Sequence, residues 1–542
     1  MAGSPQLHLR PGMWAEHNQA FARGSAFIDG NLFRPPQLAQ RFAQVVDKTG
    51  LIGLLNGANG FFAVILPLAD GSLLAATDRA RSIPLFYAVL DECVFLGDDA
   101  YWIRDQLLAA ALDSEAQLEF SFTGYVTGPD TLHPCIKQLR CAELLYVQAN
   151  KGAAVISTER YYHYIHQVVD DHGAEGLLTR LDETLAAATQ RLIEFADGRQ
   201  IALPLTGGLD SGRIAMALKR EQYPRLLGFS YGVPGNPDAQ SGERMARRLN
   251  IPWAFTPYSG ARWRRWFSRP ERKRYYRYAD HLCTLPVLQD WPAVWELKEQ
   301  GNIDTNAVIV PGYSAECFSR PHPTPLDWPP LAEDRFEPDV IADATVLLHY
   351  SLREWHGNQQ ALASRFRHRV LAALDELQLF GCSAALYEFW AMNERQAKFI
   401  TNAVRAYEFW DCDWWLPMWD SAIMDFWQQV PVKHRLGRQL STVHFQQLCT
   451  QTCGEILAPR RQRLSGSIMQ SSAAVIRRAG KHIPIIRRAY NLGRALLQYK
   501  SHPLAWHGLV RLGDFLRHYH GRANINSFLA MEWLEEISFR RD

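Results

Sequence analysis

The spacing of apolar residues changes along the chain and predicts two kinds of structure in succession. Residues 25–160 contain short apolar runs separated by tight turns, such as 61–68 and 72–76, which is typical of antiparallel strands. Over 173–195 the spacing becomes helical, with apolar residues on one face. Strand-like and helix-like segments then alternate, and the pattern after residue 340 is mainly helical. We therefore expect a β-rich N-terminal region followed by an α/β region.

The alternation is clearest in the middle of the chain. Residues 201–205 and 225–231 are apolar and strand-like, whereas 211–219 and 238–249 have helical spacing. This order is typical of βαβ units on a parallel sheet. A chain of 542 residues exceeds what one hydrophobic core supports, so several domains are expected. We place them at 1–165, 166–455 and 456–542.

Composition excludes several classes of protein. A hydrophobic fraction of 47% and a charged fraction of 21% are those of a folded globular protein. The net charge of +2 gives no sign of a nucleic-acid partner, and none is expected. The 9 cysteines show neither a CxxC pair nor metal-ligand spacing, which favours reduced thiols. Without a signal-peptide pattern or a long apolar stretch, we expect a cytoplasmic protein.

The most informative segment is Leu203 to Arg213, which leads from an apolar strand directly into a helix. Gly207 and Gly208 let the backbone approach a ligand closely, and the free N–H groups near Ser211 suit an anion. Asp210 offers the hard oxygen ligand that Mg²⁺ prefers. A simple Gly-Gly turn with a helix cap is the alternative, and these residues alone leave both interpretations open.

This segment resembles the SGGLDS pyrophosphate loop of the asparagine synthetase B family, with Thr206 where the family usually has Ser. Residues 228–238 resemble the family's second strand and loop, where adenine is received. Upstream segments resemble strands of its glutaminase domain: 59–64, 76–79, 82–87 and 97–99. The resemblance implies an α/β fold with a layered, Ntn-hydrolase-like (glutaminase-like) N-terminal domain. A parallel-sheet ATP-pyrophosphatase domain, adenine nucleotide α-hydrolase-like, would follow.

The resemblance also implies ATP and Mg²⁺ as cofactors. Nucleotide-binding residues are then expected at Thr206, Gly207, Gly208, Leu209, Asp210, Ser211, Phe229, Ser230, Tyr231 and Gly312. Metal ligands are expected at Asp210 and at Glu316, which stands in place of an aspartate of the family's second loop. An ordinary strand end is the alternative for that loop.

Two catalytic residues are implied with less complete motifs. Asp413, four residues before Pro417, stands at the position of an acid that orients or deprotonates the incoming nitrogen. The family's lysine that neutralises pyrophosphate has no clear counterpart, and Arg438 or Lys433 could replace it electrostatically. A loop cap is the structural alternative for Asp413.

The N-terminal region departs from the family pattern. A glutaminase of this family needs a cysteine directly after the initiator Met, whereas Ala2 stands there and Cys93 is the first cysteine. The family's β-lactam synthetases and lasso-peptide cyclases also lack that cysteine and use an amine. We expect the N-terminal domain to be structural.

The C-terminal segment is basic. Residues 456–513 contain no Asp or Glu, and arginines and lysines alternate with apolar residues at roughly helical spacing. Such a stretch can lie on an anionic membrane surface, peripheral to the inner membrane face, or form a cationic wall of an active-site cleft. Both possibilities stay open.

The resulting hypothesis is an ATP-dependent ligase that adenylates a carboxylate for attack by ammonia or an amine. Segments at 289–294, 310–314 and 528–533 resemble asparagine-synthetase-related proteins of surface-polysaccharide synthesis, which implies a carrier-linked uronic acid as acceptor. Other small carboxylates, including aspartate, stay open. The alternatives are an amine-using cyclase and a degenerate ATP-binding scaffold. A homodimer is a further expectation.

Overall fold

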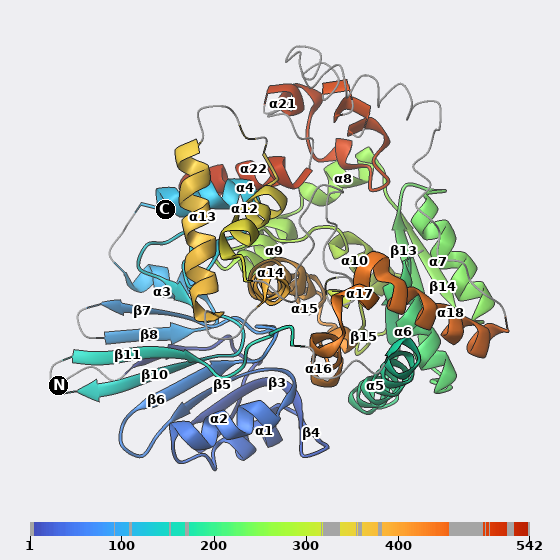
Figure 1. Ribbon diagram of the computed structural model, residues 1–542. Helices are drawn as coiled ribbons and strands as arrows, with labels where there is room; N and C mark the ends of the chain where they lie inside the picture. Colours follow the sequence, from blue (N-terminus) through green and yellow to red (C-terminus); the bar gives the residue numbers. More distant parts are fainter. Residues whose placement is uncertain are drawn as a thin grey trace.

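The computed structural model describes residues 5–90, 93–107, 111–150, 153–167, 173–206, 208–315, 317, 336–353, 355, 360–377, 382–454, 492–493, 495–497, 499–517 and 525–539. Figure 1 shows two sheets in the N-terminal region and a third, parallel sheet with helices around it. This arrangement confirms the predicted α/β class.

The N-terminal region contains two stacked sheets. The first has the order β1-β8-β7-β9, formed by Gln6–His8, Cys93–Gly97, Phe86–Leu90 and Lys137–Gln138. The second has the order β11-β10-β6-β5-β3-β2, formed by Ala153–Arg160, Glu143–Asn150, Leu73–Thr77, Asn59–Pro67, Ala20–Ile28 and Ala15–His17, with β4 (Asn31–Phe33) beside β3. The hairpin predicted at 61–68 and 72–76 is confirmed as the antiparallel pair β5 and β6.

Both faces of the second sheet are buried, which explains its continuous apolar runs. Along β5, Ala63 and Ile65 belong to the core between the two sheets. Phe62 and Val64 belong to the core beneath helices α1 (Pro35–Phe42) and α2 (Lys48–Gly57). Successive strand residues point to opposite faces, so a strand covered on both sides is apolar at every position.

The third sheet has the order β14-β13-β12-β15-β16, and all its pairings are parallel. Its strands are Trp253–Pro257, Leu226–Gly232, Ile201–Pro204, Val308–Ile309 and Asp413–Trp414. The helices α5 (Gly173–Ala196), α6 (Leu209–Arg220) and α7 (Pro237–Arg248) accompany it, and α18 (Gln439–Cys453) packs on α5 and α6. The strands and helices predicted between 173 and 249 are therefore confirmed.

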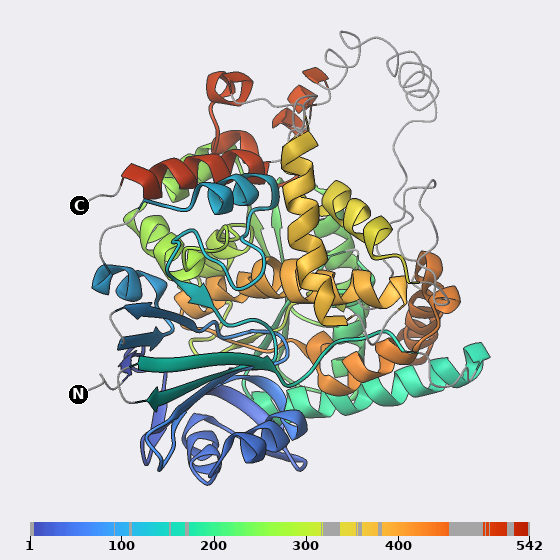
Figure 2. The same ribbon diagram turned by 60° about the vertical axis from the view of Figure 1, so that its left-hand side comes forward.

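The mainly helical pattern predicted after residue 340 is also confirmed wherever the structure describes that part of the chain. These helices are α12 (Pro338–His349), α13 (Gln360–Leu374), α14 (Ser383–Ala391), α15 (Arg405–Phe409), α16 (Ser421–Gln429), α17 (Val432–Arg435), α21 (Leu512–Arg517) and α22 (Ile525–Phe539). Earlier helices are α3 (Ala100–Gln106), α4 (Ser114–Thr123), α8 (Gly260–Phe267), α9 (Pro270–Asp280) and α10 (Trp291–Glu299). Figure 2 shows the C-terminal helix α22 beside α4. Among the described residues, no helix has both the length and the apolar character needed to span a membrane.

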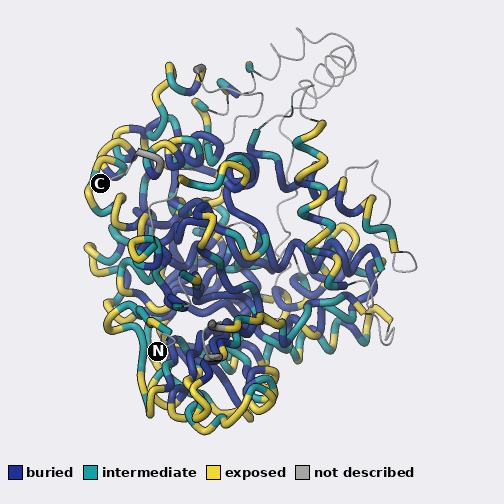
Figure 3. The backbone as a smooth tube through the Cα atoms, turned by 90° about the vertical axis from the view of Figure 1, so that its left-hand side faces the viewer, coloured by how far each residue is buried: buried dark blue, intermediate teal, exposed yellow. Residues whose placement is uncertain are grey.

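The N-terminal sheets and the parallel sheet share buried surface. The ring centroid of Phe61, in β5, lies 5.3 Å from the ring centroid of Trp414 and 4.8 Å from that of Trp415. Arg23 of β3 forms a 2.9 Å ion pair with Glu408 of α15. Figure 3 shows buried residues, in dark blue, gathered in the interior of the molecule, with exposed residues along its outer rim. The two regions therefore pack against each other through aromatic and ionic contacts.

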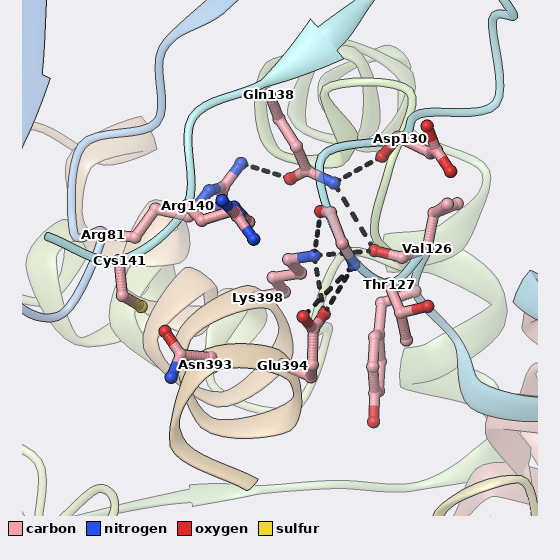
Figure 4. A network of polar contacts seen from close by, with 12 residues as sticks. Arg81, Val126, Thr127, Asp130, Gln138, Arg140, Cys141, Asn393, Glu394 and Lys398 are labelled. Atoms are coloured by element: carbon pink, nitrogen blue, oxygen red, sulfur yellow. Dashed lines mark hydrogen bonds and ion pairs between the residues drawn. The ribbon is translucent and has the colours of Figure 1, made fainter. Parts of the chain in front are cut away.

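A buried polar network also joins the two regions (Figure 4). It involves a π-helix, η2 (Met392–Ile400), and the segment that precedes β9. Lys398 of η2 forms a 2.6 Å ion pair with Glu394 and donates to the carbonyl of Val126 at 3.1 Å, while Glu394 accepts from the backbone N–H of Gly128 at 3.1 Å. Because both charges are buried and paired, the network fixes where η2 lies.

Candidate active site

The predicted pyrophosphate loop connects β12 to α6. Gly208 is the N-cap of α6 and supplies no side-chain cap, so the first N–H groups of the helix are open to a ligand. The loop is held from within, because the N–H of Gly208 donates to Oγ1 of Thr206 at 3.2 Å and the hydroxyl of Ser211 lies 3.4 Å from the same oxygen. Gly207 lies outside the described residues.

The second predicted loop lies directly against the first. A Cβ atom on Gly312 would lie 2.9 Å from the backbone nitrogen of Ser211 and 3.2 Å from Cβ of Asp210, so only glycine fits. The contact arises because β15 is the neighbour of β12 and parallel strands end at the same edge of a sheet. Ser314, which follows, has a positive φ of 65°. Glu316 lies outside the described residues.

Arg438 is brought to this loop as well. Its guanidinium pairs with Asp210, and its backbone is left-handed, with a φ of 61°, where the chain kinks into α18. A second guanidinium, that of Arg213, lies 3.7 Å from the same carboxylate, and burial lowers its pKa to about 10. Two cations on one carboxylate leave positive charge beside the open helix N-terminus, which suits phosphate.

The two loops form one end of a cavity of about 440 Å³. Its loop end is lined by Thr206, Gly208, Asp210, Ser211 and Gly312. A side chamber of about 180 Å³ shares Thr206 and Tyr231 with this cavity and adds Phe229 and Ser230. The structure thus places the described nucleotide-binding candidates around two neighbouring spaces, except Leu209, which is buried.

An unpredicted carboxylate, Asp290, lies in the wall of the larger cavity. Its Oδ2 accepts hydrogen bonds from the hydroxyls of Tyr313 (3.0 Å) and Tyr407 (2.5 Å), and its Oδ1 accepts one from Tyr231. Burial raises the pKa of Asp290, although the three phenol donors oppose that effect. Among the described residues, no Lys, Arg or His forms an ion pair with it. A buried carboxylate that faces a cavity without a cation suits a nitrogen ligand.

The sequence carried little signal for this cluster. Its tyrosines come from β13, from the loop after β15 and from α15, and no local spacing connects them. Of these tyrosines, only Tyr231 and Tyr313 lie in segments whose sequence resembles a known motif.

Asp413, expected as a catalytic acid, is not brought to this cavity. The sheet register pairs Asp413 with Val308 and Val308 with Ile201, the first residue of β12. The pyrophosphate loop follows Pro204, at the other end of that strand. The carboxylate of Asp413 is exposed and accepts a hydrogen bond from Arg199. Asp413 therefore forms a surface ion pair with Arg199, at the end of the parallel strands opposite to the predicted pyrophosphate loop.

Asp413 lines a second cavity, of about 450 Å³, between the N-terminal sheets and β16. Arg23 in its wall is neutralised by Asp98 and Glu408, both at 2.9 Å. Cys412 also lines it, but burial raises the pKa of that thiol to about 11, so a thiolate is not available near neutral pH. Cys93 lies in β8 and does not line this cavity.

The family model described as asparagine synthase matches residues 180–262. The matched segment runs from α5 through the pyrophosphate loop to β14 and into α8. The match supports an asparagine-synthase-like family and points to an ATP-using, amide-forming ligase. No curated protein matches the chain.

Proposed function

We propose that this protein is a carbon–nitrogen ligase that adenylates a carboxylate, releases pyrophosphate and then forms an amide with release of AMP. The observation that carries the proposal is the meeting of the 206–211 loop, Gly312 and Arg438 around Asp210 at one end of a cavity. The glutaminase-like and ATP-pyrophosphatase folds, and a cytoplasmic location, belong to the same proposal.

The loop end of the cavity is suited to the triphosphate of ATP. The open N–H groups at the start of α6 would contact the departing pyrophosphate, with Arg438 offsetting its charge. Asp210, together with Glu316, would hold Mg²⁺, which supplies charge neutralisation on the phosphates. When Asp210 serves as a metal ligand, Arg438 loses that partner and becomes available to the phosphates.

The first step joins a carboxylate oxygen of the acceptor to the α-phosphorus of ATP while the bond to the β-phosphate breaks. In the second step a nitrogen lone pair attacks the acyl carbon, the bond from that carbon to AMP breaks, and the nitrogen loses a proton. We assign the acceptance of this proton to Asp290, acting directly or through the hydroxyl of Tyr231. Its position in the cavity wall favours it over Asp413 for that role.

The acceptor we propose is a uronic acid sugar on a nucleotide or lipid carrier, as in surface-polysaccharide synthesis. Its hydroxyls would suit the polar groups of the cavity wall, which include Gln289, Tyr313 and Asn526. Ammonia is the proposed nitrogen donor. A carrier in a membrane would bring the protein to that surface.

A ring-closing ligase that uses a substrate amine is a second candidate. It is favoured by the same Asp290 cluster, because a carboxylate with no cationic partner among the described residues would accept a substrate ammonium group as readily as ammonium itself. A cyclase should need no free ammonia.

Mass spectrometry of products tests these candidates. Purified protein with Mg-ATP is incubated with nucleotide-linked uronic acids, aspartate or a peptide, each with and without ammonium. An amide of one acid that appears only with ammonium supports the ligase, whereas loss of water from one substrate without ammonium supports the cyclase. ATP binding with no product from any acid would favour a scaffold that has lost the chemistry.

A further inference from the structure

The described part of the basic C-terminal segment lies against the proposed nucleotide site. Residues 499–510, here called the C-terminal strap, cross the end of β13. The N–H of Val233, which follows β13, donates to the carbonyl of Pro503 at 2.6 Å, and the indole N–H of Trp263 donates to the carbonyl of Leu504 at 2.5 Å. In parallel sheets with helices on both faces, ligands bind at this end of the strands.

The strap is anchored tightly on α8. The ring of Trp506 stacks on that of Trp263, with centroids 4.8 Å apart and planes at 29°. Gly508 leaves no room for a side chain, because a Cβ atom there would lie 2.5 Å from Cα of Gly260. The strap lies outside residues 180–262, so the family match does not account for it. His502, Leu504 and Trp506 of the strap line the cavity, whereas Lys500 does not.

His502 belongs to the walls of both the larger cavity and the side chamber. Its Nδ1 accepts a hydrogen bond from the N–H of Leu504 at 3.1 Å. An accepting Nδ1 carries no proton, so the ring proton lies on Nε2. Burial lowers the pKa of His502 to about 4, which keeps the ring neutral near physiological pH.

Two other polar side chains in the side chamber, those of Ser230 and Asn236, already use their donors within the protein. The hydroxyl of Ser230 donates to the carbonyl of Leu205 at 2.7 Å. The amide of Asn236 donates to the carbonyls of Val233 and Tyr231 at 2.9 and 3.3 Å. Asp238, at the start of α7, lines the same chamber with a carboxylate, which can only accept when ionised. His502 is thus a donor, and Asp238 an acceptor, in the chamber wall.

We propose that the C-terminal strap recognises the purine base of ATP, with the Nε2–H of His502 donating to a ring nitrogen of adenine and Asp238 accepting from its amino group. His502 is a positioning residue that also sets specificity. Guanine carries a carbonyl where adenine has the amino group, and a hydrogen on N1, the ring nitrogen that would accept from His502. Its oxygen would therefore face a carboxylate, and its N1–H would face the Nε2–H of His502. The inference rests on the proposed function, because it takes ATP as the nucleotide.

The test measures equilibrium binding of Mg-ATP and Mg-GTP to the full chain by calorimetry. His502→Phe should weaken ATP binding about tenfold, the loss expected from one hydrogen bond in a site shielded from water. His502→Gln, which keeps an N–H donor, should recover most of that loss. Lys500→Gln, an exposed position on the same strap, should bind as the wild type does. The preference for ATP over GTP should fall in His502→Phe. In the amidation reaction, KM for ATP should rise while kcat stays close to that of the wild type.

The outcomes distinguish the role of His502 from the proposed function of the whole protein. If the wild type binds ATP and His502→Phe binds it equally well, with an unchanged melting temperature, the role of His502 is wrong and the proposed function stands. If the wild type binds neither nucleotide, the proposed function fails and the inference fails with it. If both His502 variants weaken ATP and GTP alike, recognition of adenine by His502 is refuted.

Discussion

At the scale of single residues, the proposed amide formation depends on Asp290 as the proton acceptor. Burial raises the pKa of Asp290, and only its ionised form can accept a proton from the nitrogen. As pH falls through that raised pKa the carboxylate becomes protonated, so the rate of amide formation should fall at a pH above the ordinary aspartate range of about 4.

Rate–pH profiles of variants check this prediction. Asp290→Asn should lower the rate of amide formation by roughly 10²- to 10⁴-fold and remove the acidic limb. Asp413→Asn is the matched control, and its profile should follow the wild type because Asp413 is exposed and paired with Arg199. The opposite pattern, with the limb lost in Asp413→Asn, would restore the catalytic role that the sequence suggested for Asp413.

A second residue-scale prediction concerns the contact between the two loops. Gly312→Ala would place a methyl group 2.9 Å from the backbone nitrogen of Ser211, and that backbone cannot yield without moving the pyrophosphate loop. We expect a loss of about 1 to 3 kcal/mol in the free energy of unfolding and a large loss of pyrophosphate release. Urea denaturation and the release assay measure the two effects.

Gly53→Ala is the control for this change. Nothing lies within 4 Å of a Cβ at Gly53, which is in helix α2, so alanine should be neutral or stabilising by about 0.5 to 1 kcal/mol. Equal stability and activity in Gly312→Ala would mean that the two loops do not lie as close as described.

At the scale of elements, the π-helix η2 connects the N-terminal region to the candidate active site. Its buried Lys398 donates a hydrogen bond to the carbonyl of Val126 in the N-terminal region. Its last residues, Phe399 and Ile400, line the cavity. Lys398→Met would leave Glu394 buried without its cation, and we expect a loss of about 3 to 5 kcal/mol in the free energy of unfolding.

A double-mutant cycle separates this pair from its surroundings. Replacing both residues, with Lys398→Met and Glu394→Gln, should cost less than Lys398→Met alone, because no uncompensated charge remains. Strictly additive losses in denaturant unfolding would show that the two side chains do not interact.

Local elements were predictable where their signals are local. The strand, Gly-rich loop and helix between 201 and 220 appear in the sequence as an apolar run, two glycines and a change of period, and the structure has them as β12 and α6. The position of Asp413 could not be predicted from residue spacing alone. Its distance from Pro417 fitted the motif, but β16 is a two-residue strand whose register decides where Asp413 lies, and register is a tertiary property.

The parts of the site that the sequence did not indicate all depend on long-range contacts. The Asp290 cluster joins elements from 231 to 407, and His502 arrives from the C-terminal strap. The composition of that segment left two interpretations open, a membrane-bound stretch and a cationic wall of the active-site cleft. In its described part, however, the strap contributes an imidazole, an indole and an aliphatic side chain to the cavity, and residues 455–491 lie outside the described residues.

At the scale of the whole molecule, the N-terminal sheets pack against the parallel sheet, and we expect them to act as a scaffold. In the cavity between them, Arg23 is neutralised and Cys412 is a thiol rather than a thiolate. We therefore predict that glutamine cannot replace ammonium as the nitrogen source. Nitrogen-15 labelling checks this: labelled ammonium should enter the amide, and amide-labelled glutamine should not. Label transfer from glutamine would contradict this prediction, because it requires a nucleophile that the described residues of this cavity do not supply.

The central claim is that Asp210 organises ATP for adenylation, and pyrophosphate release from Mg-ATP tests it most directly. The wild type should release pyrophosphate when its acceptor carboxylate is present, and Asp210→Asn should abolish that release while remaining folded. Glu221→Gln, at the far end of the same helix α6, should keep the wild-type rate. Full turnover by Asp210→Asn would contradict the account, because the loop around Asp210 would then have no part in the chemistry.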